Sequence, residues 1–321
     1  MEGKFDSSLE LIKIESELEP KNSLIYHYTS PVGMLGIMRT GGQEKLWFTQ
    51  YDSLNDRSER ENMFEFLHEY CDYQVKANNI SSSFCDLVKS VTLDDQVLFI
   101  EMDRENPNHA YAYRDAFHTY LCCFSKNPDS LAMWNYYSKS KHYEGYAIGM
   151  WRYKFPTGTT SGYKLSFKNV IYTNHEKVEI LNRLILPMNK EYEVAKKEQR
   201  QEFVMRIQEI CDTLQLVFKD FCFAHEEEIR AILEVPRRYA QTGVDGYGSS
   251  SSKIISERKY REKDGYIIPY VELLLPDTCT QEIIVAPLLE KELSLRNLKD
   301  MLINYGYPHI VVKPSQIPIR Y

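Results

Sequence analysis

The sequence contains no apolar run of about 18 residues, so no segment is long enough to form a transmembrane helix. Its N-terminus lacks a basic region followed by an apolar stretch, which excludes a secretory signal peptide. There is no Cys-x-x-Cys pair, and the seven cysteines sit mostly among apolar neighbours. This usage predicts buried, reduced thiols in a cytoplasmic protein, and it favours neither a disulfide framework nor a bound metal.

The composition is that of a globular protein. The chain has 321 residues, of which 43% are hydrophobic and 26% charged. Neither an internal repeat nor a long linker separates parts of the chain. We therefore expect one domain over residues 1–321, with an acidic extension at 1–20, a long inserted helix at 190–222 and a flexible loop at 243–252. The mixture of strand-like and helix-like segments predicts an α+β fold on antiparallel or mixed strands.

Short apolar runs predict the strands, and 3.6-residue periodicity predicts the helices. Ser30-Pro31 caps a short helix that Gly41-Gly42 ends. Longer helices are expected at 55–78, 81–102, from 128 onward and 290–305. Strands are expected at 24–28, 46–49, 118–125, 146–150, 165–172, 226–235, 253–260, 266–275, 281–286 and 309–313.

The charge is unevenly distributed. The net charge of the chain is −7, and residues 1–110 carry 20 acidic and 10 basic side chains, which gives −10. In contrast, residues 237–263 hold seven basic and three acidic side chains. Arg258, Lys259 and Arg261 lie in this segment, the only part of the chain that could attract a polyanion. A solvated loop is the alternative interpretation.

Three short clusters combine polar and aromatic residues. His27, Tyr28 and Thr29 end the first predicted strand, where a histidine could contact a ribose hydroxyl or could be an ordinary core histidine. Thr49 ends the second strand, and Asn55 follows in a turn. Ser125 ends a third strand, and Trp134 and Tyr137 share a helix face, where they could pack together or form a platform for a flat ring.

The cluster at 225–230 is the most informative. On a strand, Glu226, Glu228 and Arg230 would project to one side. Such a group can be a ladder in which arginine offsets the repulsion between two carboxylates. It can also be a site where one carboxylate stabilises a developing cation while its neighbour orients a nucleophile.

The order of these clusters resembles a known bacterial family. The chain has H-Y-T-S, then L-W-F-T with L-N-D, C-F-S with M-W-x-x-Y, E-x-E-x-R, I-I-P-Y-V-E-L, E-I-I-V-A-P and S-x-I-P-x-R, from Leu24 to Arg320. The family opens with H-Y-T-S and closes with S-x-I-P-Y-R, and it is grouped with ADP-ribosyltransferase-like proteins, some of which are toxins in phage defence. Ile319 departs from the usual aromatic residue of the terminal motif, and Ala286 replaces a common glycine.

The resemblance implies a split, mostly antiparallel β-sandwich that binds NAD and cleaves its nicotinamide–ribose bond. By resemblance, His27 holds a ribose, Glu228 stabilises the cation and Glu226 orients or deprotonates the acceptor. The nicotinamide would be held by Thr49, Tyr28, Trp134 and Tyr137. Thr29, Asn55, Ser125 and Arg230 complete the expected cofactor-binding set. Side chains and backbone would meet the pyrophosphate, because the chain has no G-x-G-x-x-G loop.

The expected function is thus an NAD-dependent ADP-ribosyltransferase, a toxin that modifies nucleic acid, with RNA favoured and Arg258, Lys259 and Arg261 as acceptor contacts. Such a toxin would also need an antitoxin. Three alternatives remain open: an NAD glycohydrolase, transfer to a protein, and a non-enzymatic nucleotide-binding module. The paired carboxylates favour transfer over binding, because a binder of an anionic dinucleotide gains nothing from them.

Overall fold

The computed structural model describes residues 5–53, 57–91, 99–102, 110–113, 117–137, 144–156, 163–196, 199–236, 254–263, 265–287 and 290–318. The loop expected at 243–252 lies outside these residues. The chain divides into two compact units, where the sequence predicted one domain. We call them the helical unit (1–19, 55–116 and 169–224) and the sheet unit (20–54, 117–168 and 225–321).

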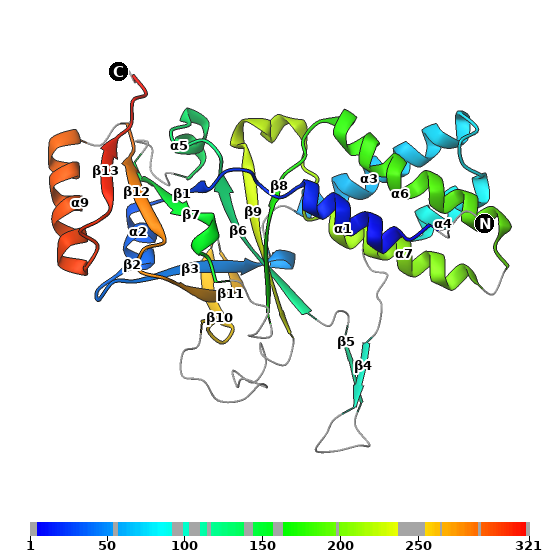
Figure 1. Cartoon of the computed structure of the whole chain (residues 1–321), viewed down its shortest axis with the longest axis horizontal. Helices are drawn as coiled ribbons and strands as arrows, with labels where there is room; N and C mark the ends of the chain where they lie inside the picture. The colour runs from blue at the N-terminus through cyan, green and yellow to red at the C-terminus, as the bar shows by residue number, and fades with distance from the viewer. Residues whose placement is uncertain are drawn as a thin grey trace. The chain divides into compact units, whose positions relative to one another are not determined.

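The helical unit packs its amphipathic helices around one apolar core. Leu67, Phe84, Leu184 and Ile207 are among the buried residues of that core. The acidic N-terminal segment is part of this unit, because Leu11 and Ile14 are buried in the same core. The helices are α1 (Ser7–Glu17), α3 (Arg57–Lys76), α4 (Ser82–Ser90), α6 (Asn174–Val194) and α7 (Arg200–Leu214), and a small hairpin pairs β4 (Phe99–Met102) with β5 (Ala110–Tyr113) (Figure 1).

The sheet unit is built on an 11-stranded, mostly antiparallel sheet. Its main path runs β10-β11-β3-β6-β1-β7-β12-β13, and β2, β9 and β8 pair beside β3, β6 and β9 respectively. The strands are β1 (Leu24–Thr29), β2 (Met38–Arg39), β3 (Gln43–Gln50), β6 (Phe117–Ser125), β7 (Tyr146–Trp151), β8 (Lys164–Asn169), β9 (Glu228–Pro236), β10 (Lys259–Lys263), β11 (Tyr266–Leu275), β12 (Thr280–Val285) and β13 (Val311–Pro314). The fold is therefore α+β, as the sequence predicts.

Helices α2 (Pro31–Ile37), α5 (Leu131–Tyr137) and α9 (Lys291–Tyr305) belong to the sheet unit. The Ser30 hydroxyl accepts from Gly33 N and caps α2, as predicted, but this helix ends before Gly41 and Gly42. Those two glycines have φ of 85° and 75° and form the turn between β2 and β3.

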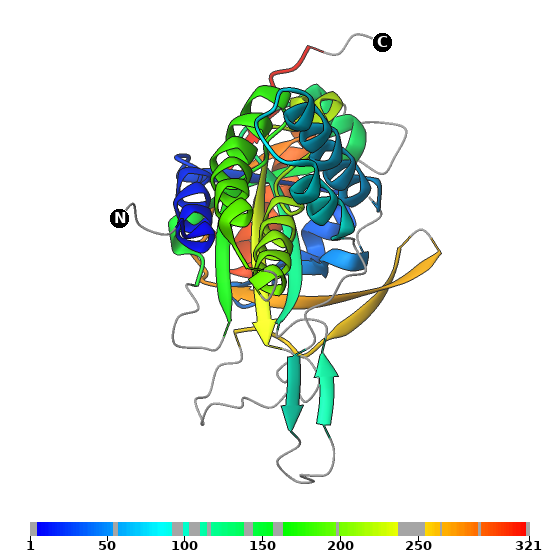
Figure 2. The same cartoon turned by 90° about the vertical axis from the view of Figure 1, so that its right-hand side faces the viewer.

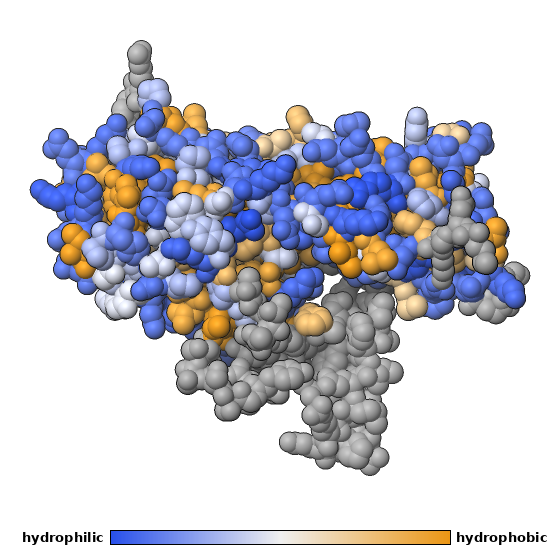
Figure 3. All heavy atoms as spheres, viewed as in Figure 1, coloured by the Kyte–Doolittle hydropathy of each residue, from blue (hydrophilic) through white to orange (hydrophobic). Residues whose placement is uncertain are grey.

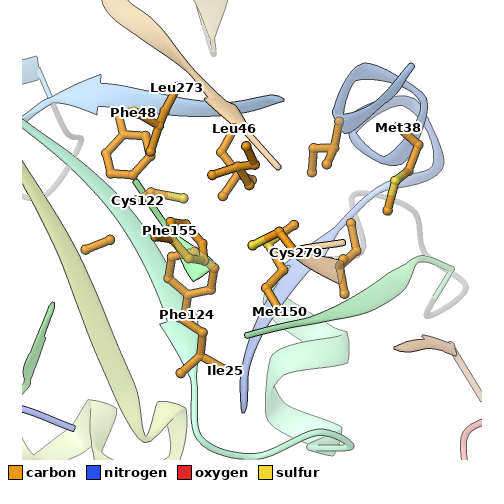
Figure 4. Close-up of a cluster of buried hydrophobic side chains, with 14 of the residues drawn as sticks. Ile25, Met38, Leu46, Phe48, Cys122, Phe124, Met150, Phe155, Leu273 and Cys279 are labelled. Carbon is orange, nitrogen blue, oxygen red and sulfur yellow. The ribbon is translucent and has the colours of Figure 1, made fainter. Parts of the chain in front are cut away.

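The main core of the sheet unit lies on one face of the sheet. Figure 4 shows apolar side chains of β1, β3, β6, β7 and β11 meeting there, among them Ile25, Phe48, Phe124 and Leu273. Because side chains alternate along a strand, Lys45, Trp47 and Thr49 of β3 point to the opposite face.

Strand β6 has a break in strand pairing along one of its two edges. One edge of β6 pairs with β9 along its whole length. On the other edge, β3 pairs with the middle of β6 and β1 pairs with its last residue, so the described sheet has no strand pair at residues 122–124 there. The pairs on this edge are Thr49 with Leu121, Gln50 with Tyr120, and Tyr26 with Ser125. The candidate site is arranged around this gap.

Two predicted helices differ from the structure. In place of one helix over 81–102, α4 ends at Ser90 and β4 begins at Phe99. The long helix expected at 190–222 is two helices, because α6 already begins at Asn174 and α7 starts afresh at Arg200.

In the part of the chain that the structure describes, no helix is both long and apolar enough to cross a membrane. On the face shown in Figure 3, hydrophobic residues lie in separate patches among hydrophilic ones. The cysteines match the prediction of free thiols: all seven are free, and five of them are buried.

Candidate active site

The two predicted catalytic glutamates lie at the turn that leads into β9. Glu226 is the last residue of a 3-10 helix, η4 (Phe221–Glu226), and Glu228 is the first residue of β9. Glu227, between them, has φ of 46°, in the left-handed region. The strand expected from 226 therefore begins two residues later, and strand alternation does not place Glu226 beside Glu228. Both side chains are buried, with 6% and 4% of their surface exposed.

Hydrogen bonds from the end of β6 hold this turn. The Ser125 hydroxyl donates to Glu226 O at 2.7 Å, and Lys126 N donates to Glu227 O at 3.0 Å. Asn127 Nδ2 donates to Glu227 Oε1 at 3.2 Å. Ser125 itself is fully buried, and its hydroxyl helps to hold this turn.

The Arg230 guanidinium contacts both oxygens of the Glu228 carboxylate. Arg230 Nε lies 3.0 Å from Glu228 Oε1, and Nη2 lies 3.3 Å from Oε2. Both side chains are buried, and the paired geometry fixes the carboxylate in one orientation. The sequence predicted that Glu228 and Arg230 share a face, and this ion pair confirms it.

His27 lies at the gap between β1 and β3. Its Nδ1 is 3.0 Å from Cys123 O, one of the β6 carbonyls at the gap. Burial lowers the pKa of His27, and the nearby Arg261 cation lowers it further, so the ring is neutral at pH 7. Because a carbonyl oxygen only accepts, Nδ1 carries the hydrogen and Nε2 is left as an acceptor. A ribose hydroxyl could donate to that Nε2.

The short β3–β6 pairing is the second part of the site. Arg261 Nη2 donates to Thr49 Oγ1 at 2.8 Å, and Arg258 Nε donates to Tyr120 OH at 3.2 Å. The junction consists of two residue pairs, Thr49 with Leu121 and Gln50 with Tyr120. Arg261 of β10 contacts Thr49, and Arg258, the residue before β10, contacts Tyr120. Three buried polar atoms there have no hydrogen-bond partner: Arg258 Nη2, Arg261 Nε and Gln50 Oε1.

Neither arginine forms an ion pair with a carboxylate among the described residues. Arg261 instead lies over the rings of Trp47 and Tyr270, at 5.1 and 5.6 Å from their centres. Burial lowers the pKa of Arg261, which remains a cation at pH 7. Buried N–H groups of a cation without an acid partner are typical of a site for an anionic ligand.

Lys259, the third predicted acceptor contact, is placed differently. Its Nζ lies 2.8 Å from Glu272 Oε2 on β11, and it forms no ion pair or side-chain hydrogen bond with the described residues of the β3–β6 junction. Of the three cations grouped in the sequence analysis, Arg258 and Arg261 therefore contact the β3–β6 junction, and Lys259 contacts Glu272.

Tyr28 and Trp134 pack in a small second core. They are 4% and 1% exposed, and their rings meet edge to face at 4.7 Å. The Tyr28 hydroxyl donates to Asn127 O at 2.9 Å. Tyr137, at the end of α5, is 36% exposed. The contacts correspond to the packing interpretation of these rings, and Trp134 and Tyr137 do not form one exposed platform.

The C-terminal motif is tied to the start of α5. Ser315 Oγ donates to Asp129 Oδ1 and Gln316 N donates to Asp129 Oδ2, both at 2.7 Å. Trp134 Nε1 donates to the same carboxylate at 2.8 Å. These contacts give the motif a structural role.

Thr29 and Asn55 complete the predicted set. Thr29 is the last residue of β1 and packs closely against Gly33, where an added Cβ would collide with Thr29 Oγ1. Asn55 lies outside the described residues.

The sequence analysis missed Gln50, Tyr120 and Tyr136. Tyr136 stacks on His225, the residue before Glu226, with ring centres 5.5 Å apart. Tyr120 sits inside a continuous apolar run that predicts only a buried strand. No sequence signal marks Gln50, because its position at the junction follows from strand pairing.

Residues 133–231 match the model of a family described as "Protein of unknown function (DUF2971)". Over this segment the chain is similar to that family. The matched segment contains Glu226, Glu228 and Arg230, and ends before Arg258 and Arg261. No curated protein and no solved structure matches the chain. These comparisons do not link it to the ADP-ribosyltransferase superfamily.

Proposed function

We propose that this protein is an NAD-dependent ADP-ribosyltransferase whose acceptor is nucleic acid, with RNA favoured. One observation carries the proposal: two arginines without acid partners among the described residues and two buried carboxylates lie about four residues apart along strand β6. The cations meet β6 at residues 120–121, and the carboxylate turn meets it at Ser125. Four residues of a strand span about 14 Å, which suits a ligand with a negative and a positive part.

At the cation end, Arg258 and Arg261 would bind the pyrophosphate. Their buried N–H groups without partners would then donate to phosphate oxygens, the ligand geometry that guanidinium groups match best. Thr49 would orient Arg261 through the bond at 2.8 Å. The sequence analysis predicted that both arginines contact the acceptor, whereas this assignment has them contact NAD.

At the carboxylate end, Glu228 would face the nicotinamide ribose. The bond between C1′ of that ribose and the nicotinamide nitrogen breaks, its electron pair leaves with nicotinamide, and positive charge develops on the ribose. A fixed carboxylate stabilises that charge. The acceptor then attacks C1′ and gives its proton to Glu226. Both carboxylates are nearly buried, so the proposal requires this end of the site to open when NAD binds.

His27 lies between the two ends. Its neutral ring, with Nδ1 on the Cys123 carbonyl, presents Nε2 as a hydrogen-bond acceptor. The position suits a ribose hydroxyl, the role that the sequence suggested. The gap at which β1 and β3 separate along β6 also fits the split sheet expected of the superfamily.

Incubation of the full chain with NAD labelled in its adenylate part and with total cellular RNA and protein tests the proposal. We expect label in RNA and release of nicotinamide. Label found only as free ADP-ribose would identify a glycohydrolase, and label only in protein a protein-modifying enzyme. Bound label without nicotinamide release would leave a binding module and refute the catalytic proposal.

A further inference from the structure

We infer that one face of the sheet unit binds the single-stranded RNA that serves as acceptor, an inference that rests on the proposed function. This face, here called the basic face, consists of the side chains of β2, β3, β11 and β10 that point away from the main core. Its members are Arg39, Lys45, Trp47, Lys259, Tyr270 and Glu272.

The basic face has more cations than its single acid can neutralise. Glu272 is 5% exposed and contacts three cations. Lys259 Nζ lies 2.8 Å from its carboxylate, and Lys45 Nζ and Arg39 Nη2 both lie at 3.5 Å. Burial alone would raise the pKa of Glu272, but the three cations hold it below the usual range. Three positive charges and one negative charge leave +2 on a chain whose net charge is −7.

The cations of the basic face remain accessible. The side chains of Arg39, Lys259 and Lys45 are 44%, 39% and 25% exposed. Their shared carboxylate holds them in place without covering them. Ordered, exposed cations in excess are what a phosphate backbone requires.

An aromatic ring lies among these cations. Trp47 is 36% exposed, stands opposite Glu272 in the β3–β11 register and lies 4.9 Å from the Tyr270 ring. A base of a single strand can stack on such a ring, whereas the paired bases of a duplex cannot reach it. The combination favours a single strand over a duplex, and over an acidic peptide that would use only the charges.

The basic face leads directly to the proposed NAD site. Lys259 and Arg261 are alternate residues of β10 and so share one side of it, and Arg261 contacts Thr49 at the junction. Figure 2 shows the β10–β11 hairpin reaching out from the sheet. Strand β10 is the terminal strand of the main path, next to β11. An RNA strand lying on the basic face would bring its nucleotides to the end of β3, beside the bound dinucleotide.

Fluorescence anisotropy with a short labelled single-stranded RNA and the full chain tests the inference. The variant Arg39→Gln/Lys45→Gln removes two charges that have no part in the NAD site, and Lys259 remains as the partner of Glu272. We expect a loss of about tenfold or more in RNA affinity, and a salt dependence whose slope falls by about two. The matched control, Arg296→Gln/Lys299→Gln on α9, should bind like the wild type.

A second variant, Trp47→Ala, keeps every charge and removes the ring. Because the same ring contacts Arg261, the affinity of this variant for NAD is measured beside its affinity for RNA. It should weaken RNA binding without changing the salt slope. Wild-type affinity from both basic-face variants would overturn the inference, and so would equal competition by poly-glutamate or duplex RNA of matched charge. Nicotinamide release is followed in the same samples. If no sample releases nicotinamide but the variants still weaken RNA binding, the proposed function is refuted and the inference of an RNA-binding face is retained.

Discussion

At the scale of single residues, Arg261 gives the sharpest test of ligand binding. It makes one hydrogen bond to Thr49 and stacks on two rings, and its Nε has no partner. If phosphate is that partner, Arg261→Gln should reduce NAD affinity about ten- to a hundredfold, because a hydrogen bond to a charged group contributes about 1.5–3 kcal/mol. Calorimetric titration with NAD measures this, with Arg296→Gln as the control. Unchanged affinity would show that Arg261 does not contact the ligand.

His27 makes a prediction about pH. Burial lowers its pKa in the folded protein, whereas in the unfolded chain it titrates near 6.5. Below pH 6.5 the unfolded state therefore binds more protons at this residue, and the contribution of His27 to the free energy of unfolding should fall as the pH drops. His27→Gln cannot titrate and should lose less stability over this range. Urea unfolding of both proteins at a series of pH values measures the difference, and parallel curves would mean that His27 titrates normally.

At the scale of elements, a buried carboxylate joins the start of β3 to the start of β12. Glu44 accepts from Thr280 N at 3.2 Å and from Thr280 Oγ1 at 2.7 Å, and it is fully buried. Burial raises its pKa from 4.5 to about 7. The folded state thus holds a proton between these values that the unfolded state has lost. The contribution of Glu44 to stability should therefore fall as the pH rises through this range, by at most about 3 kcal/mol.

The variant Glu44→Gln stays neutral at every pH and can keep bonds to Thr280. Its free energy of unfolding should therefore increase relative to that of the wild type as the pH rises from 4.5 to 7. Above pH 7 the difference between the two proteins should stay constant. Thermal unfolding of both proteins across this range measures the gain. A difference that does not depend on pH would show that Glu44 ionises as it does in water.

The elements also show what local sequence can predict. Most strands of the sheet unit were predictable, because each is a short apolar run between turn residues. The start of α6 carried a readable signal as well: Thr173 Oγ1 accepts from Glu176 N, a capping box in T-x-x-E. Pro187 then favours a helix start after it, but α6 continues through it. Burial of Leu184, Ile185 and Met188 offsets the local penalty of about 3 kcal/mol.

The candidate site was less predictable than the strands. Glu228 and Arg230 were expected on one face, because strand alternation alone places them there. Glu226 does not lie on the same strand face as Glu228, because Glu227 between them adopts the left-handed conformation. A glutamate gives no sequence signal for that conformation. The meeting of Thr49 with Arg261 depends on strand pairing between residues 212 positions apart. No local pattern contains such information.

At the scale of the whole molecule, the chain combines a helical unit and a sheet unit, each made of three separate segments. Composition and periodicity showed helices and strands but not this division, because each unit is assembled from segments far apart in sequence. All the residues of the proposed site belong to the sheet unit. The proposed chemistry must therefore depend on the register of β6 with β3, β1 and β9.

The most direct test of the central claim is the rate at which nicotinamide is released from NAD by the wild type and two variants. Glu228→Gln removes the charge proposed to stabilise the ribose cation, whereas Glu234→Gln removes a charge on the same strand that pairs with Lys164 at 3.1 Å. We predict that the wild type and Glu234→Gln release nicotinamide equally, and that Glu228→Gln is slower by about 10² or more while it still binds NAD. No release by the wild type, or equal rates from all three proteins, would contradict the account.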